Sequence, residues 1–244
     1  MCGGFEVARE VIVKAENIKK RSVLSRIIKI TLLIILLLLC ALYFTLGLVY
    51  REGAFTVTLG EGQDESSGLV VFDDITSARG KRRLDALPVN DMDNISYKWL
   101  PANVDTEADG SHNGDNYLAY SFYVENQGEK EFNYFYELVV DSVVKDVDDA
   151  IRVRIYENKV DTTYAKASIN GEAEPLTTAF KYDTNRPIKG QTVLIKKREG
   201  FKPKDLDKFT IVIWIEGDDP ECLDNLIGGA IKMHMIITEE PSES

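Results

Sequence analysis

Cysteine and histidine are scarce in this sequence, and their positions exclude several classes of protein. Only three cysteines and two histidines occur in 244 residues. Cys2 belongs to a basic start and Cys40 to a long apolar run, so Cys222 alone falls in the acidic C-terminal part. A disulfide within that part is excluded, and with it a small secreted domain held together by disulfides. This cysteine usage fits surface proteins that seldom use disulfides, as in many Gram-positive bacteria.

Recognisable catalytic motifs are missing as well. The two histidines, His112 and His234, are far apart, and no H-E-x-x-H pair is present, which excludes a zinc peptidase of that type. G-x-S-x-G, Walker A and dinucleotide-binding patterns are also absent. His234 lies between two methionines of an alternating segment and is best explained as a strand residue. The sequence therefore favours a non-enzymatic function, while a catalytic site scattered along the chain stays open.

Charged residues are absent from one long run, Ile30 to Val49. These twenty residues, at about 1.5 Å rise per residue, are long enough to cross the roughly 30 Å hydrocarbon core of a bilayer as a helix. A cleaved signal peptide is the alternative, but its apolar region usually has about 7 to 15 residues and ends in a small-x-small site. The sequence predicts a retained signal-anchor helix over residues 27–50.

Charge is distributed unevenly about this span. Residues 1–50 carry seven basic and three acidic residues, net +4, whereas the remaining 22 basic and 37 acidic residues leave residues 51–244 at −15. By the positive-inside rule, residues 1–26 form a basic cytoplasmic segment and residues 51–244 an extracellular domain of a single-pass membrane protein. The acidity of that domain argues against nucleic acid as a partner.

Short alternating segments fill the acidic part, and no internal repeat, long linker or long amphipathic helix interrupts them. They predict an all-β fold, a jelly-roll-like antiparallel β-sandwich of about eight to ten strands in one domain. The run FTIVIWI, residues 209–215, is apolar on both faces and is predicted to be a central strand. The other predicted strands are 54–59, 69–72, 117–125, 132–140, 151–156, 162–167, 192–196 and 230–238.

Two of these segments carry many aromatic residues. Residues 117–125, YLAYSFYVE, and 132–140, FNYFYELVV, flank the turn-forming Asn126-Gln127-Gly128 and predict an antiparallel hairpin. We expect the aromatic side chains to pack across strands rather than to form a platform for a glycan or nucleobase.

An acidic loop over residues 105–116 is the strongest candidate for a metal site. Its oxygen-bearing residues have the spacing of positions 1, 3, 5, 7 and 9 of the twelve-residue calcium loop, and Gly110 takes the position of the sharp turn. The candidate ligands are Asp105, Glu107, Asp109, Ser111 and Asn113. Position 12 is Asn116, where a bidentate glutamate is usual, so the sequence predicts a weak calcium site at most. An ordinary turn before the next strand is the competing interpretation.

A second acidic cluster runs from Glu216 to Asp224. Asp219 as N-cap, Pro220 at the first helical position and Glu221 in the first turn predict the start of a helix. A metal site is the alternative, because several carboxylates in one turn repel one another unless a cation or backbone N–H groups offset their charge.

Residues 51–238 resemble the TasA and camelysin group of Firmicute envelope and biofilm-matrix proteins. The resemblance lies in the basic and apolar N-terminal segment, the early strand AFTVTL, and the segments NYLAYSFYVENQGEKEFNYFYELVV and FTIVIWIEGDDPECLDNLIGGAIKMHMIIT. It implies a jelly-roll-like sandwich, export, and in some members polymerisation by a strand that completes the sheet of the next subunit. Members typically lose a signal peptide, whereas this span has the features of a retained anchor. Camelysin-like proteins are often labelled metallopeptidases, yet no residue here matches a zinc-peptidase motif.

Three functional hypotheses follow from these observations. The first is a membrane-anchored, non-enzymatic surface protein that assembles with itself or with other envelope or matrix proteins through its sandwich. The second is a metal-dependent surface peptidase or hydrolase that uses the acidic loops, with calcium as the possible metal. The third is an extracytoplasmic sensor that signals through residues 1–26.

Overall fold

A computed structural model describes residues 26–44, 54–60, 68–77, 79–181 and 191–240. The chain divides into two units, residues 1–52 and 53–244. The described part of the first unit is a strongly apolar helix, Arg26–Phe44, with exposed side chains. It is long and apolar enough to cross a membrane, a property that a signal sequence shares. Residues 45–50 of the predicted span and residues 1–25 of the basic segment lie outside the described residues.

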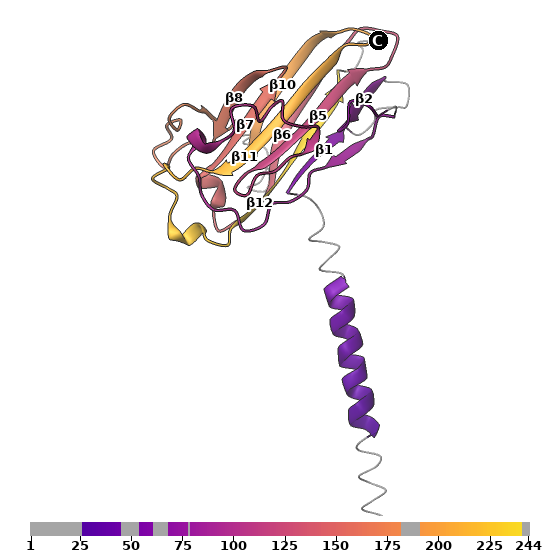
Figure 1. Cartoon of the computed structure of the whole chain (residues 1–244), viewed down its shortest axis with the longest axis vertical. Coiled ribbons are helices and arrows are strands. Elements are labelled where there is room, and N and C mark those ends of the chain that lie inside the picture. Colours follow the sequence, from indigo (N-terminus) through magenta and orange to yellow (C-terminus); the bar gives the residue numbers. More distant parts are fainter. Residues whose placement is uncertain (1–25, 45–53, 61–67, 78, 182–190, 241–244) are drawn as a thin grey trace, which may run out of the picture. The chain divides into compact units, whose positions relative to one another are not determined.

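The second unit is an all-β sandwich of two sheets (Figure 1), so the predicted fold class is confirmed. One sheet has the strand order β10 (Gln191–Phe201), β6 (Phe132–Val144), β12 (Ala230–Glu239), β1 (Phe55–Leu59) and β3 (Arg83–Asp85). The other has the order β2 (Leu69–Phe72), β5 (Leu118–Asn126), β11 (Leu206–Ile215), β7 (Ile151–Glu157), β8 (Val160–Ala165) and β9 (Thr178–Ala179), with β4 (Gly110–Ser111) also paired to β5. Three short 3₁₀ helices occur at η1 (Tyr97–Trp99), η2 (Val147–Asp149) and η3 (Asp224–Leu226).

The two faces of β11 explain why its sequence is apolar throughout. Phe209, Ile211 and Ile213 belong to the core between the sheets. Val212 and Trp214 belong to a smaller cluster that includes Ile95, Leu100 and Val104 of the segment before β4. The prediction of a central strand is confirmed, since β11 lies between β5 and β7.

The strand that follows the apolar helix in the sequence is part of the chain's own sheet. β1 lies between β12 and β3, and its residues pair in parallel with β12 from Phe55 opposite Met233 to Leu59 opposite Ile237. β8 and β9 also pair in parallel. Both sheets are therefore mixed rather than wholly antiparallel.

The predicted hairpin of residues 117–140 is wrong, because β5 and β6 belong to different sheets. The chain crosses from one sheet to the other at Asn126, whose side chain is buried. Its amide nitrogen donates hydrogen bonds to the carbonyl oxygens of Lys130 (2.9 Å) and Phe201 (2.8 Å), and its amide oxygen accepts one from the Gly128 N–H (2.9 Å). These bonds hold the crossing loop against β10, so Asn126 supports an arch between the sheets instead of a two-strand turn.

Three loops gather at one end of the sandwich, which we call the loop end: residues 145–150, 166–177 and 217–229. The strand registers place them together, because Val144 at the end of β6 is opposite Ala230 at the start of β12, and Ile215 at the end of β11 is opposite Ile151 at the start of β7. Ala165, which ends β8, pairs with Arg152 at the same level. Residues 166–177 and 217–229 lie at the left and lower left of the sandwich in Figure 1.

Candidate functional site

The five residues of the predicted calcium loop are divided among separate contacts. Gly110, with φ of +68°, makes the predicted sharp turn in a conformation that favours glycine. The loop then enters β4 instead of continuing around an ion. Asp105 lines a cavity of about 230 Å³ together with Tyr156, Lys208 and Thr210, and Glu107 is exposed.

The other three candidate ligands already accept hydrogen bonds from the protein. The Asp109 carboxylate accepts bonds from the Tyr123 hydroxyl (2.6 Å) and from the backbone N–H of Ile75 (3.1 Å). The Ser111 hydroxyl oxygen accepts one from the Leu87 N–H (2.8 Å), and the Asn113 amide oxygen accepts one from the Ala119 N–H (2.9 Å). A calcium ion at this loop has to replace these contacts, and the calcium site stays a prediction.

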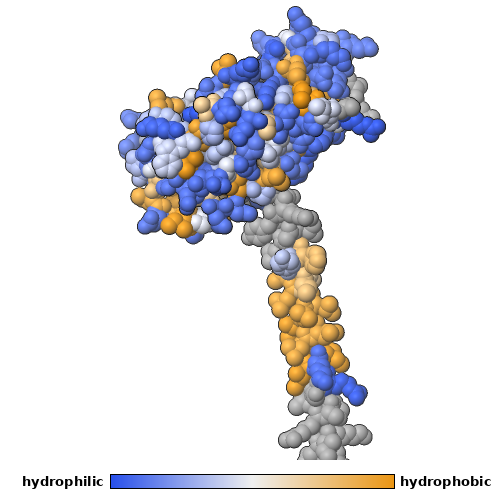
Figure 2. Space-filling model, in the orientation of Figure 1, coloured by the Kyte–Doolittle hydropathy of each residue, from blue (hydrophilic) through white to orange (hydrophobic). Residues whose placement is uncertain are grey.

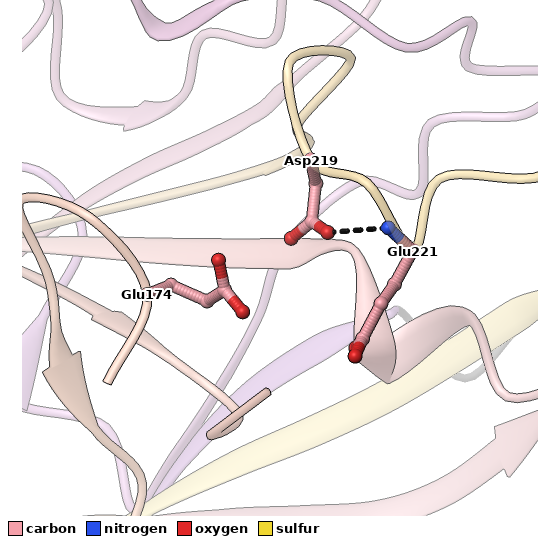
Figure 3. Close-up of side chains that lie close together, drawn as sticks. All are labelled: Glu174, Asp219 and Glu221. Carbon is pink, nitrogen blue, oxygen red and sulfur yellow. Dashed lines mark hydrogen bonds between the residues drawn. The ribbon is translucent and has the colours of Figure 1, made fainter. Parts of the chain in front are cut away.

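Three carboxylates from two loops converge at the loop end. Glu174 of loop 166–177 and Asp219 and Glu221 of loop 217–229 place one oxygen each within 4.8 Å of one another. Figure 3 shows the Glu174 and Asp219 carboxylates facing each other, with the Glu221 backbone N–H donating to Asp219 Oδ1 at 2.7 Å. Among the described residues, this is the group of carboxylate, histidine or cysteine side chains whose spacing suits a metal ion.

Arg152 of β7 already occupies this cluster. Its Nη2 lies 2.5 Å from Asp219 Oδ2 and 3.4 Å from Glu174 Oε2. All three side chains are buried, and an arginine between two carboxylates offsets the cost of taking these charges out of water. The alternation of residues 151–156, IRVRIY, predicts Arg152 on the polar face of the strand with Arg154, but the structure buries Arg152 beneath the loop end.

The acidic cluster does not start a helix, so the prediction of an N-cap at Asp219 is wrong. The Asp219 carboxylate does accept the Glu221 N–H, as a cap would. However, residues 219–222 form a turn, in which the Cys222 N–H donates to the Asp219 carbonyl at 3.0 Å. The second Asp219 oxygen binds Arg152, a contact that local sequence spacing does not reveal.

Burial and mutual repulsion disfavour the ionised form of Glu174 beside the other two carboxylates. The pKa of Glu174 is raised, chiefly because burial disfavours its ionised form and secondly because Asp219 repels it, while Arg152 acts in the opposite direction. Oxygen-only donors suit a hard cation such as calcium or magnesium rather than the zinc of a peptidase. With Arg152 in place, the arrangement works as an ion-pair network that joins β7 to both loops.

Both histidines and Cys222 contact protein atoms. The His112 ring nitrogens lie 3.0 Å from the Gly110 carbonyl oxygen and 2.9 Å from that of Val104. His234 Nδ1 lies 2.6 Å from Asp141 Oδ1 on the neighbouring strand, consistent with its prediction as a strand residue. The Cys222 sulfur accepts a hydrogen bond from the Asn94 amide at 3.2 Å. The His234 contact joins two neighbouring strands, and the Cys222 contact joins two loops.

The loop end also exposes large apolar side chains. Ile169, Leu176, Leu223 and Ile227 are 91%, 81%, 62% and 71% exposed. The two loops that carry them are joined by a hydrogen bond from the Ile169 N–H to Glu221 Oε1 (2.9 Å). Figure 2 shows apolar surface at the lower left of the sandwich, where loop 217–229 lies in Figure 1. Sequence reasoning missed these residues, because isolated apolar positions in loops carry no periodic signal.

No protein family model matches the sequence, and the comparison with characterised proteins gives no match. Two solved structures of a β-glucosidase from Kluyveromyces marxianus each match 76% of this chain. One is selenomethionine-labelled, with 9% identity and a TM-score of 0.26; the other contains glucose, with 12% identity and a TM-score of 0.22. The chain spans 18% and 17% of the length of these two chains. Similarity at this level carries no argument about function.

Proposed function

We propose that this chain is a membrane-anchored surface protein whose sandwich acts outside the cytoplasm by binding rather than by catalysis. The apolar helix Arg26–Phe44 supplies the anchor, and the basic residues before it favour a cytoplasmic N-terminus. The sandwich then serves assembly of the cell envelope or of an extracellular matrix. The resemblance to the TasA and camelysin group supports this assignment.

The observation that carries the assembly function is the long edge strand β10. Its eleven residues, Gln191–Phe201, end the five-stranded sheet and pair with β6 on one side. Lys181 forms a single bridge to Thr192 at one end of the strand. Lys181 also donates from its N–H to the Val193 carbonyl oxygen (3.3 Å) and from its Nζ to that of Ile195 (3.3 Å). No other strand among the described residues pairs with this side of β10, so another strand can extend the sheet there by hydrogen bonding.

The charges of β10 indicate what kind of strand can pair there. Lys196, Lys197 and Arg198 are consecutive in a domain with a large excess of acidic residues. Two copies of β10 paired with each other would bring these like charges together, which is unfavourable. Each of the three already has an acidic partner in its own domain: Lys196 lies 3.6 Å from Glu157, Lys197 2.7 Å from Glu240 and Arg198 3.2 Å from Asp207. A partner strand therefore does not have to be acidic.

The test compares the full chain with an edge variant. Ile195→Lys places a further charge on β10 at a side chain that is 41% exposed, and Ile75→Lys is the matched control at a side chain that is 48% exposed on a loop. Light scattering and electron microscopy of the chain in nanodiscs, over a wide range of protein density, should show association that the edge variant loses and the control keeps. A chain that stays monomeric throughout refutes self-assembly, and equal association of both variants refutes the role of β10.

A further inference from the structure

The loop end is also the end of the sandwich at which the polypeptide arrives from the apolar helix. β1 runs parallel to β12, and Phe55 at its start pairs with Met233, three residues after β12 begins. Phe55 therefore lies at the same end of the sandwich as loop 217–229. Residues 45–54, ten in number, join Phe44 of the helix to Phe55 of β1.

This short connection limits how far the loop end can be from a membrane that holds the helix. Ten residues span at most about 35 Å even when fully extended. A connection of this length keeps the loop end at a high effective concentration near the bilayer surface, so weak contacts are enough to dock it. The four exposed apolar side chains Ile169, Leu176, Leu223 and Ile227 are of the kind that enter the headgroup region.

We propose that the loop end docks on the surface of the bilayer in which the helix is anchored, through Ile169, Leu176, Leu223 and Ile227. This inference rests on the proposed anchoring by Arg26–Phe44. The occupant of the apolar surface is the headgroup and upper acyl region of the lipid. Docking fixes the sandwich to the membrane at this end and leaves the β10 edge available to partners.

Charge determines which lipid suits the loop end. Two ion-pair groups neutralise part of its acidity: Arg152 binds Asp219 and Glu174, and Lys166 lies 2.9 Å from Asp148 and 2.6 Å from Asp149. Lys145 adds one more positive charge, and its Nζ donates to the Ile227 carbonyl oxygen at 2.5 Å. Five further carboxylates of these loops still leave an excess of negative charge: Asp146, Glu172, Asp218, Glu221 and Asp224. An anionic membrane repels such a surface, so docking is expected on a zwitterionic bilayer.

The experiment uses the full chain reconstituted through its helix into phosphatidylcholine liposomes. Cys2, Cys40 and Cys222 are replaced by serine, and an environment-sensitive fluorophore is attached through Ile227→Cys at the loop end or through Glu129→Cys in the arch at the opposite end. Lipids that carry a spin label near the headgroup quench a fluorophore that touches the bilayer surface. Flotation of the liposomes and resistance to alkaline extraction report separately on anchoring.

We expect the label at position 227 to be blue-shifted and quenched at least twofold more than the label at position 129. Adding Ile169→Ser and Leu176→Ser should remove at least half of that difference while the melting temperature stays the same. Replacing a third of the phosphatidylcholine by phosphatidylglycerol at low salt should weaken quenching, and added salt should restore it.

Two results overturn the docking. Equal quenching at both positions in chains that float with the liposomes shows that the loop end does not touch lipid. A blue shift at position 227 that grows with the number of chains per liposome, without quenching by lipid, shows that a second copy covers the apolar residues instead. A chain that fails to float overturns the anchoring of the proposed function, a result distinct from either.

Discussion

Replacing Tyr134 by phenylalanine tests a hydrogen bond that joins the two sheets through the core. Tyr134 lies on β6 and donates its hydroxyl hydrogen to Asp207 Oδ2 on β11 at 2.6 Å. Both residues are buried. Asp207 also accepts bonds from Arg198 Nε (3.2 Å) and from the Asn158 amide (2.7 Å), so its carboxylate keeps two partners in the variant. A hydrogen bond to a charged group contributes about 1.5–3 kcal/mol, and we expect Tyr134→Phe to lower the free energy of unfolding by about 2 kcal/mol at neutral pH.

The same substitution should show a distinctive dependence on pH. The pKa of Tyr134 is raised well above its ordinary value, first by burial and then by the negative charge of Asp207. The unfolded chain therefore loses the Tyr134 proton at about pH 10 while the folded chain keeps it, so stability falls as the pH rises above that value. At about pH 11 this effect costs the wild type about 1.4 kcal/mol, which the variant does not lose. The difference between the two proteins should shrink from about 2 kcal/mol to about 0.6 kcal/mol.

Urea unfolding of wild type and variant at neutral pH and at about pH 11 measures both quantities, with far-ultraviolet circular dichroism as the signal. Tyr156→Phe is the matched control, because this tyrosine of β7 is only partly buried and its hydroxyl has no hydrogen-bond partner among the described residues. It should change stability by less than about 0.5 kcal/mol. A difference between wild type and Tyr134→Phe that is independent of pH refutes the raised pKa. A neutral-pH difference no larger than that of the control refutes the energetic role of the bond.

Three further changes test other parts of the structure. Asn126→Ala removes three hydrogen bonds from the arch between β5 and β6 and should lower the free energy of unfolding in urea by about 2–3 kcal/mol. The control Gln127→Ala, at the exposed neighbouring residue, should lower it by less than about 0.5 kcal/mol. Equal losses of stability in the two variants contradict the role of Asn126 in the arch. A carboxyl with a raised pKa destabilises the fold less as the pH falls and the carboxyl takes up its proton. The free energy of unfolding of wild type relative to Glu174→Gln should therefore rise as the pH falls from neutral to about 4.5. A difference between the two proteins that stays constant over this range contradicts the raised pKa. The calcium prediction requires millimolar calcium to raise the melting temperature and Asp109→Asn to abolish that rise, so a melting temperature that calcium leaves unchanged excludes the site.

Much of the fold could be predicted from the sequence because strand positions depend on local pattern. Alternating apolar residues mark β1, β7 and β12, a short apolar run marks β2, and the longer run that is apolar on both faces marks β11 as central. The pairing of β5 and β6 could not be predicted in the same way. Alternation shows which residues face the core, but two strands that face each other across a core have the same pattern as two strands of a hairpin. The hydrogen bonds of the buried Asn126 side chain favour the arch over the hairpin, but one of its partners, Phe201, is 75 residues away in the sequence. Local sequence pattern therefore could not reveal the arch.

The acidic cluster was harder to predict for a similar reason. The sequence points to residues 105–113 because their oxygens are close together along the chain, whereas the structure brings together Glu174 and Asp219 from two loops. Arg152 completes the arrangement from a third element. The one available signal was the density of carboxylates from Glu216 to Asp224, which needs a cation or backbone donors nearby. That the cation is an arginine follows only from the fold.

The position of β1 favours one of two routes for the proposed assembly. Releasing β1 to another subunit breaks its pairing with both β12 and β3 and exposes Phe55 and Val57, which are fully buried. Each of these side chains contributes about 1.5–3 kcal/mol by its burial, so exchange regains stability only when the β1 of a neighbour fills the same place. Addition of a strand to β10 leaves the pairing between β10 and β6 intact and competes only with the single bridge from Lys181 to Thr192. Assembly through β10 should therefore be rapid and reversible on dilution, whereas exchange of β1 requires partial unfolding and should be slow, and the rate at which assemblies dissociate distinguishes the two.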